Sequence, residues 1–142
     1  MLGIQELARR LRSAGTADEF VEIVRSGDVD FVDVRFADLP GGWHHVTLPV
    51  SRVVPSVFSD GIGFDGSSVP GFTTVERGDM VLLPDRRTAT GERYGNHGTV
   101  AMVATAADAA ERTAYALDPR IIAQRAEEAL VASFQQIAYE IG

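Results

Sequence analysis

Residues 31–48 read FVDVRFADLPGGWHHVTL, and this stretch decides the fold. Val32, Val34 and Phe36 alternate with charged residues, and an apolar–polar alternation with a period of two predicts a half-buried β-strand. The Leu39–Gly42 segment is typical of a turn, because proline fixes one backbone angle and glycine admits positive φ values. An extended pattern then resumes to the end of the stretch, so the whole of it predicts a β-hairpin.

Helical patterns lie on either side of this hairpin. Apolar residues recur at helical spacing within residues 4–11. Thr16 stands three residues before Glu19, a capping-box pattern that predicts the start of a second helix. Asp118-Pro119 predicts the start of a third helix, because proline at the first helical position gives up no needed N–H group. A short helix is also expected at residues 51–58.

The middle of the chain is dominated by strand and loop patterns. Buried strands are expected at residues 80–83 and 99–104, with a long polar loop at 85–98 between them. Residues 60–68 are too rich in glycine for a regular element, and residues 106–116 fit either a helix or an irregular connection. Strands in the middle and helices at the ends favour an α+β fold over a doubly wound parallel sheet.

The composition limits what the chain can bind. A length of 142 residues suits one domain of ordinary size. The net charge of −7 argues against nucleic acid or an anionic membrane as the main partner. The absence of cysteine excludes disulfides and thiolate metal sites. No apolar run approaches the length that spans a membrane, and the N-terminus carries a charge where a signal peptide is apolar, so we expect a cytoplasmic chain.

Two further stretches carry a family resemblance when they are taken in order with the hairpin. Residues 60–72 read DGIGFDGSSVPGF and residues 79–85 read DMVLLPD, with Glu76 between them. Together with the hairpin and the Asp118–Arg120 segment, they resemble the N-terminal β-grasp domain of bacterial-type (type I) glutamine synthetase. The resemblance spans about residues 28–130.

This resemblance implies a β-grasp-like mixed sheet packed against helices. It divides the chain into an N-terminal helical segment (1–27), a β-grasp domain (28–117) and a C-terminal helix (118–142) that would lead into the family's catalytic domain. In the family, ATP, glutamate and Mg²⁺ or Mn²⁺ bind in that longer domain, which we expect these 142 residues not to include. We therefore expect neither a metal nor a cofactor site of that kind in these residues, and no ligase activity from them alone.

The resemblance also implies a role for the glycine-rich loop. In the family, the N-terminal domain of one subunit completes the active site of its neighbour, so a homo-oligomer is expected. The aspartate that matches Asp65 helps bind ammonium and accept its proton, and the serine that matches Ser68 lies at the same site. Phe72 matches a position where an aromatic ring flanks the nucleotide region. Read without the resemblance, Asp65-Gly66 is a common pair in tight turns.

A second hypothesis describes a non-catalytic interaction module. Such a domain would self-associate, or dock onto a complete glutamine synthetase. Val69, Pro70 and Phe72 are apolar residues in a loop that we expect to be partly exposed, so we place an interaction surface near residues 69–72.

Histidine and tryptophan side chains suggest sites that we judge to be structural. His44 and His45 are adjacent on a predicted strand and should face opposite ways, and His97 lies in a predicted loop, so no metal site is expected. Trp43 opens a predicted strand, where an aromatic side chain more often packs than binds a ligand. Ser67 or Ser68 would need a histidine base to act as a nucleophile.

Overall fold

The computed structural model describes residues 3–74 and 78–141, with the backbone alone for 136–141. Glu76, which contributed to the family resemblance, lies outside the described residues. The helices are α1 (Ile4–Arg12), α2 (Ala17–Ser26) and α3 (Pro119–Ile141). The strands are β1 (Phe31–Ala37), β2 (Trp43–Pro49), β3 (Ile62–Asp65), β4 (Asp79–Pro84), β5 (Thr90–Tyr94) and β6 (His97–Asp108). Short 3₁₀ turns are η1 (Val50–Arg52), η2 (Pro55–Phe58), η3 (Gly66–Ser68) and η5 (Arg86–Thr88).

The strands form one mixed sheet of six strands in the order β2-β1-β6-β4-β3, with β5 pairing with β6 off this path. β1 runs parallel to β6, and the other described pairings are antiparallel. The expected hairpin is confirmed: β1 pairs with β2 around a turn in which Gly41 has a φ of +95°. This architecture confirms the α+β fold with a mixed β-grasp sheet.

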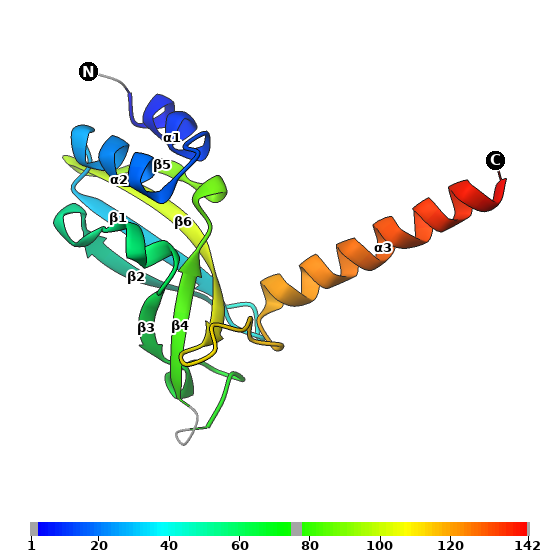
Figure 1. Cartoon of the computed structure of the whole chain (residues 1–142). Helices are drawn as coiled ribbons and strands as arrows, with labels where there is room; N and C mark the ends of the chain where they lie inside the picture. Colours follow the sequence, from blue (N-terminus) through cyan, green and yellow to red (C-terminus); the bar gives the residue numbers. More distant parts are fainter. Residues whose placement is uncertain (1–2, 75–77, 142) are drawn as a thin grey trace.

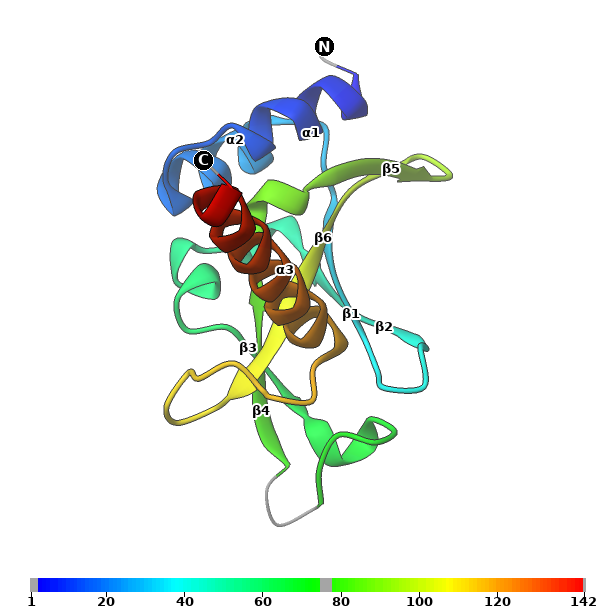
Figure 2. The same cartoon turned by 90° about the vertical axis from the view of Figure 1, so that its right-hand side faces the viewer.

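Helices α1 and α2 lie over one face of the sheet, whereas α3 extends away from it (Figures 1 and 2). Apolar side chains of these two helices and of the strands make one core, whose largest fully buried members include Leu11, Phe20, Val32, Val34, Leu82 and Met102. Burial of this core is the main stabilising contribution to the fold. Among the described residues, no helix is both long and apolar enough to cross a membrane.

Local capping patterns behave as predicted. The Thr16 hydroxyl accepts a hydrogen bond from the Glu19 amide at 3.1 Å, and the Glu19 carboxylate accepts one from the Gly15 amide at 2.8 Å. Asp118 caps α3 by accepting a hydrogen bond from the Arg120 amide at 2.7 Å. The Thr16 and Asp118 contacts satisfy backbone donors that the first turn of a helix leaves free, and the Glu19 carboxylate holds the residue before the cap.

Several expectations for the middle of the chain are wrong. Residues 85–98 are not a long loop, because β5 lies within them and pairs with β6. Residues 62–65 form β3, which is held by its pairing with β4. In place of one helix at 51–58 there are the two turns η1 and η2. The first two errors share a cause, since each strand depends on a partner strand distant in the sequence.

Trp43 does not pack as expected. Its side chain is 66% exposed, because it begins the edge strand β2 and stands opposite Ala37 beside the turn of the hairpin. A tryptophan that is exposed at the edge of a sheet does not belong to the core. Such exposure is more typical of a contact surface.

Candidate functional site: the Asp65 loop

The Asp65 loop, defined here as residues 65–72, follows β3 at the end of the sheet far from α1 and α2 (Figures 1 and 2). Asp65 is the last residue of β3 and stands opposite Asp79 of β4. The next residue is held close to the sheet, because the Gly66 amide donates to the Gly78 carbonyl at 2.7 Å. A Cβ at Gly66 would collide with the buried Met80 side chain, which would have to shift to admit any larger residue.

The Asp65 carboxylate accepts three hydrogen bonds from its own loop. Oδ1 accepts from the Ser67 hydroxyl at 2.6 Å and from the Ser67 amide at 2.9 Å, and Oδ2 accepts from the Ser68 hydroxyl at 3.0 Å. The side chain of Ser67, then its amide, then Ser68 lower the pKa of Asp65 below its usual value. The residue is exposed, so the loop presents an ionised carboxylate to solvent at neutral pH.

The two serine hydroxyls are engaged by Asp65 rather than by a histidine. In the part of the chain that the structure describes, the three histidines pair with other aspartates: His44 with Asp38, His45 with Asp33 and His97 with Asp30. No group of three histidine, aspartate or glutamate side chains among the described residues is arranged to hold a metal ion. The arrangement therefore gives no support to a serine nucleophile.

The returning half of the loop folds back onto the sheet. The Val69 amide donates to the Gly66 carbonyl, and the Phe72 amide donates to the Val69 carbonyl, both at 3.1 Å. Gly71 has a φ of +79°, a conformation that glycine adopts without strain. These turns bury Val69 and Phe72, which are only 7% and 5% exposed. The expectation of an exposed apolar surface at residues 69–72 is therefore wrong, and only Pro70 of its three side chains is exposed.

Phe72 packs inside an aromatic cluster. Its ring centroid lies 5.3 Å from that of Tyr115, 6.1 Å from that of Phe36 and 6.5 Å from that of Phe64. Such contacts add to the stabilisation from burial alone. The ring thus anchors the loop, while contact with a nucleotide stays a prediction.

A second polar cluster, not anticipated from the sequence, lies on the sheet around Asp33. This carboxylate is 6% exposed and accepts hydrogen bonds from His45 at 2.7 Å, Thr47 at 2.8 Å and Arg35 at 2.8 Å. Burial, the largest influence, raises the pKa of Asp33, but these three donors together lower it below its usual value. Arg35 also makes a two-pronged ion pair with Glu92 of β5 at 2.6 and 2.8 Å.

A sequence signal for this cluster does exist. The alternation of β1 places Asp33 on the face opposite the buried valines, and the hairpin register sets it against Thr47. The neighbouring cavity, of about 380 Å³, is lined by Phe31, Asp33, His45, Thr47, Tyr94, His97 and Thr99. The sequence does not predict this cavity because it does not predict β5, the strand that carries Tyr94.

Comparisons with known proteins cover most of the chain. A family model described as "Glutamine synthetase, beta-Grasp domain" matches residues 28–109. The chain is 44% identical over 111 residues to glutamine synthetase of Frankia alni, covering 78% of this chain and 23% of that protein. It is 41% identical over 118 residues to glutamine synthetase of Mycolicibacterium smegmatis, covering 83% of this chain and 25% of that protein.

Solved structures agree on the fold. Plasmodium falciparum glutamine synthetase superposes with a TM-score of 0.72 at 19% identity, over 79% of this chain and 22% of that one. The ADP complex of GmaS superposes with a TM-score of 0.62 at 20% identity, over 71% of this chain and 23% of that one. The chain spans about a quarter of the length of the curated relatives it matches. With most of its β-grasp fold matched by the family model and by these relatives, the chain belongs to the glutamine synthetase beta-Grasp domain family.

Proposed function

We propose that this chain serves as the N-terminal domain of a cytoplasmic glutamine synthetase, in which its Asp65 loop supplies part of the ammonium site of a neighbouring subunit. The observation that carries the proposal is the state of Asp65, an exposed, ionised carboxylate whose three hydrogen-bond donors all belong to the next three residues. Such a group can meet a partner surface without giving up contacts to the rest of its own domain. Its charge attracts a cation by Coulomb interaction.

The proposed reaction is the ATP-dependent joining of glutamate and ammonia through a γ-glutamyl phosphate. ATP, glutamate and Mg²⁺ or Mn²⁺ would bind to the partner region of a complete enzyme. Asp65 would hold the ammonium ion and accept its proton, and Ser68 would orient Oδ2 of the carboxylate. The low pKa of Asp65 favours cation binding in the free chain, and exclusion of water by a partner surface would raise that pKa toward proton acceptance.

The domain division proposed with this function follows the sequence boundaries. In this proposal, residues 1–27 would be an N-terminal helical segment, 28–117 the β-grasp domain, and 118–142 the connection to a catalytic domain. In this arrangement α3 is a connector, which accounts for its extension away from the sheet (Figure 1).

A hybrid enzyme tests the ammonium role. Residues of this chain would replace the aligned N-terminal segment of the Mycolicibacterium smegmatis relative, and steady-state kinetics would be measured for ammonium, glutamate and ATP. We expect Asp65→Ala to lower kcat/KM for ammonium about 100-fold or more, because a positioned proton acceptor contributes about that much. The KM values for glutamate and ATP should change less than about twofold, since uniform binding of those substrates is untouched.

Asp79→Asn is the matched control. Asp79 is an exposed carboxylate opposite Asp65 across the β3–β4 pair, so its removal changes the local charge equally without touching the loop. It should leave the ammonium kinetics within about twofold of the parent hybrid. Equal effects of the two substitutions, or an unchanged ammonium KM and kcat in Asp65→Ala, would reject the proposed role.

The alternative function, a self-associating or docking module, is favoured by one observation on α3. This helix exposes large apolar side chains along its length, namely Ile122, Leu130, Val131 and Phe134, which are 45–64% exposed. Exposed apolar groups in such number mark a contact surface. Sedimentation of the chain, alone and mixed with the Mycolicibacterium smegmatis enzyme, tests it: a concentration-independent monomer that stays separate from the enzyme would reject this alternative.

A further inference from the structure

The segment between β6 and α3 lies against the returning half of the Asp65 loop. In it, the Tyr115 hydroxyl donates to the Phe72 carbonyl, and the two rings lie 5.3 Å apart. We propose that Tyr115 is a positioning residue for the Asp65 loop, which it holds to the sheet through the Phe72 carbonyl. An effect of Tyr115 on catalysis rests on the function proposed above, whereas the effect of Tyr115 on the loop does not.

Phe72 is where the returning half of the loop is held from outside. Hydrogen bonds at three-residue steps connect it back to the start of the loop: the Phe72 amide donates to Val69, and the Val69 amide donates to Gly66. Gly66 directly follows Asp65. A partner for the Phe72 carbonyl therefore restrains the far end of a turn series that begins at the carboxylate.

Tyr115 is itself fixed at two backbone positions. Its amide donates to the Ala106 carbonyl of β6 at 2.8 Å, and its carbonyl accepts from the Asp118 amide at 3.1 Å. Asp118, which is 2% exposed, also accepts a hydrogen bond from the Ala106 amide at 2.7 Å. Tyr115, the cap of α3 and β6 are thus one hydrogen-bonded unit, and a rigid support of this kind can hold a loop in place.

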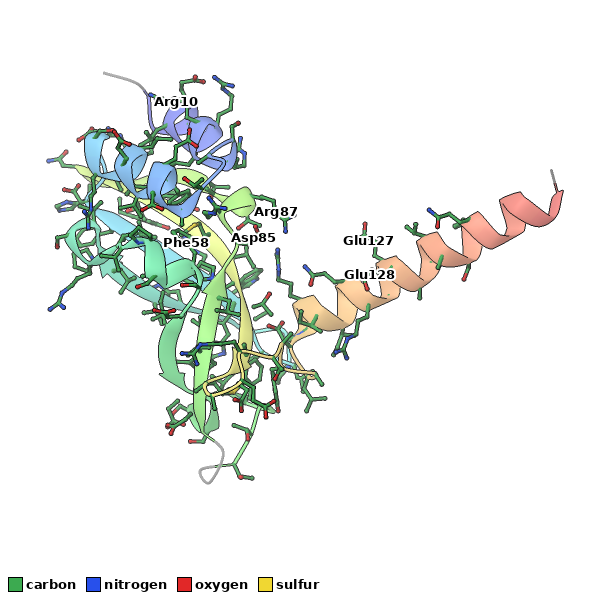
Figure 3. All side chains as sticks on the ribbon, viewed as in Figure 1. Arg10, Phe58, Asp85, Arg87, Glu127 and Glu128 are labelled. Atoms are coloured by element: carbon green, nitrogen blue, oxygen red, sulfur yellow. The ribbon has the colours of Figure 1, made fainter. Side chains whose placement is uncertain are left out.

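The first turn of α3 is tied to the sheet at the other end of β4, away from Asp79 and the Asp65 loop. Arg120 donates to the Asp85 carboxylate at 2.7 Å, and Asp85 follows β4 beside η5 (Figure 3). Farther along the helix, Glu127 and Glu128 project from α3 and are exposed (Figure 3). Among the described residues, the contact with Tyr115 comes from Asp118 at the cap of α3, and Arg120 holds the first turn of the helix to Asp85.

The test removes one oxygen atom. Tyr115→Phe in the full chain keeps the ring in the aromatic cluster but deprives the Phe72 carbonyl of its donor. Amide hydrogen exchange, read by NMR, should quicken about fivefold at Val69 and Phe72, which is the effect of losing one ordinary hydrogen bond. Exchange at Val34 and Leu82, in the centre of the sheet, should stay unchanged.

Tyr94→Phe is the matched control. Its hydroxyl donates to Glu92 at 2.5 Å in the Asp33 cluster. The substitution therefore removes the same hydroxyl oxygen from a tyrosine whose hydrogen bonds do not involve the loop. Loop exchange should equal that of the parent chain. If Tyr115→Phe leaves the loop amides unchanged, or quickens all amides equally as a general loss of stability would, the positioning role is overturned.

The hybrid enzyme separates this inference from the proposed function. There, Tyr115→Phe should raise the KM for ammonium several-fold and leave the KM for glutamate unchanged, a split that a loss of stability would not produce. If the loop amides quicken while both Tyr115→Phe and Asp65→Ala leave ammonium kinetics unchanged, the ammonium role fails and the positioning of the loop stands. If Asp65→Ala acts and Tyr115→Phe does not, the positioning role in catalysis fails.

Discussion

Asp65 and Asp33 each accept three hydrogen bonds, but the donors come from different distances along the chain. Ser67 and Ser68, immediately after Asp65, supply all of its donors. Asp33 takes two of its three from His45 and Thr47, on the other strand of the hairpin. The first carboxylate is exposed and the second is buried.

The two carboxylates also differ in how burial and hydrogen bonding together set their pKa values. The pKa of Asp65 is lowered chiefly by the Ser67 side chain, with little opposition from burial. The pKa of Asp33 is raised most by burial, and hydrogen bonds from His45, Arg35 and Thr47 bring it below its usual value. A carboxylate whose donors are its sequence neighbours can stay accessible to a ligand. A carboxylate whose donors lie on another strand joins the two strands and stabilises the sheet.

The largest effect is expected when the strand-spanning carboxylate is removed. Asp33→Ala should lower the free energy of unfolding by about 2 kcal/mol, because it removes three hydrogen bonds to a buried carboxylate, two of which join β1 to β2. Urea unfolding followed by circular dichroism measures the change. A loss below about 0.5 kcal/mol, the range of ordinary surface substitutions, would show that the Asp33 cluster does not hold the sheet.

The fold could be predicted where the pattern was local. The hairpin needed only the alternation around Val34 and the turn before Gly42, and the start of α2 needed only the Thr16 and Glu19 pair. β3 and β5 were missed because glycine and polar residues make weak strands by themselves. β5, from Thr90 to Tyr94, is stable only against β6.

The candidate site shows the same division. Asp65 and Ser68 were found through an ordered set of motifs, and the structure brings them together at 3.0 Å. Val69 and Phe72 are buried although the sequence predicts partial exposure, because the loop packs against Tyr115, which lies 43 residues beyond Phe72 in the chain. Sequence patterns give the chemistry of a loop more readily than its burial.

A smaller effect on stability is expected when the pH is lowered. This test separates the contribution of the Asp33 charge from that of the side-chain shape. Because the folded-state pKa of Asp33 lies below the unfolded value of about 3.9, its stabilising contribution is complete above the unfolded pKa. That contribution is lost as the pH falls through the folded-state pKa. The stability gap between the parent chain and Asp33→Asn should therefore be constant above about pH 5 and narrow below about pH 4.

Urea unfolding at a series of pH values measures this gap, with His45 and Arg35 present in both proteins. Both chains lose stability in acid through their other carboxylates, so only the difference between them reports on Asp33. A gap that stays constant down to about pH 2 would mean that the geometry of the side chain, rather than its charge, matters to the sheet.

The smallest effect is expected when the exposed carboxylate is removed. Asp65→Ala should shift the midpoint of thermal unfolding by less than about 3 °C, because solvent reaches the freed Ser67 and Ser68 donors and the loop stays anchored by Phe72. Differential scanning calorimetry of the full chain, with Asp33→Ala measured beside it, gives the comparison. A shift as large as that of Asp33→Ala would make Asp65 a structural residue. A small shift combined with a large loss of ammonium kinetics in the hybrid enzyme would mean that the carboxylate is retained for binding, at little benefit to the fold that carries it.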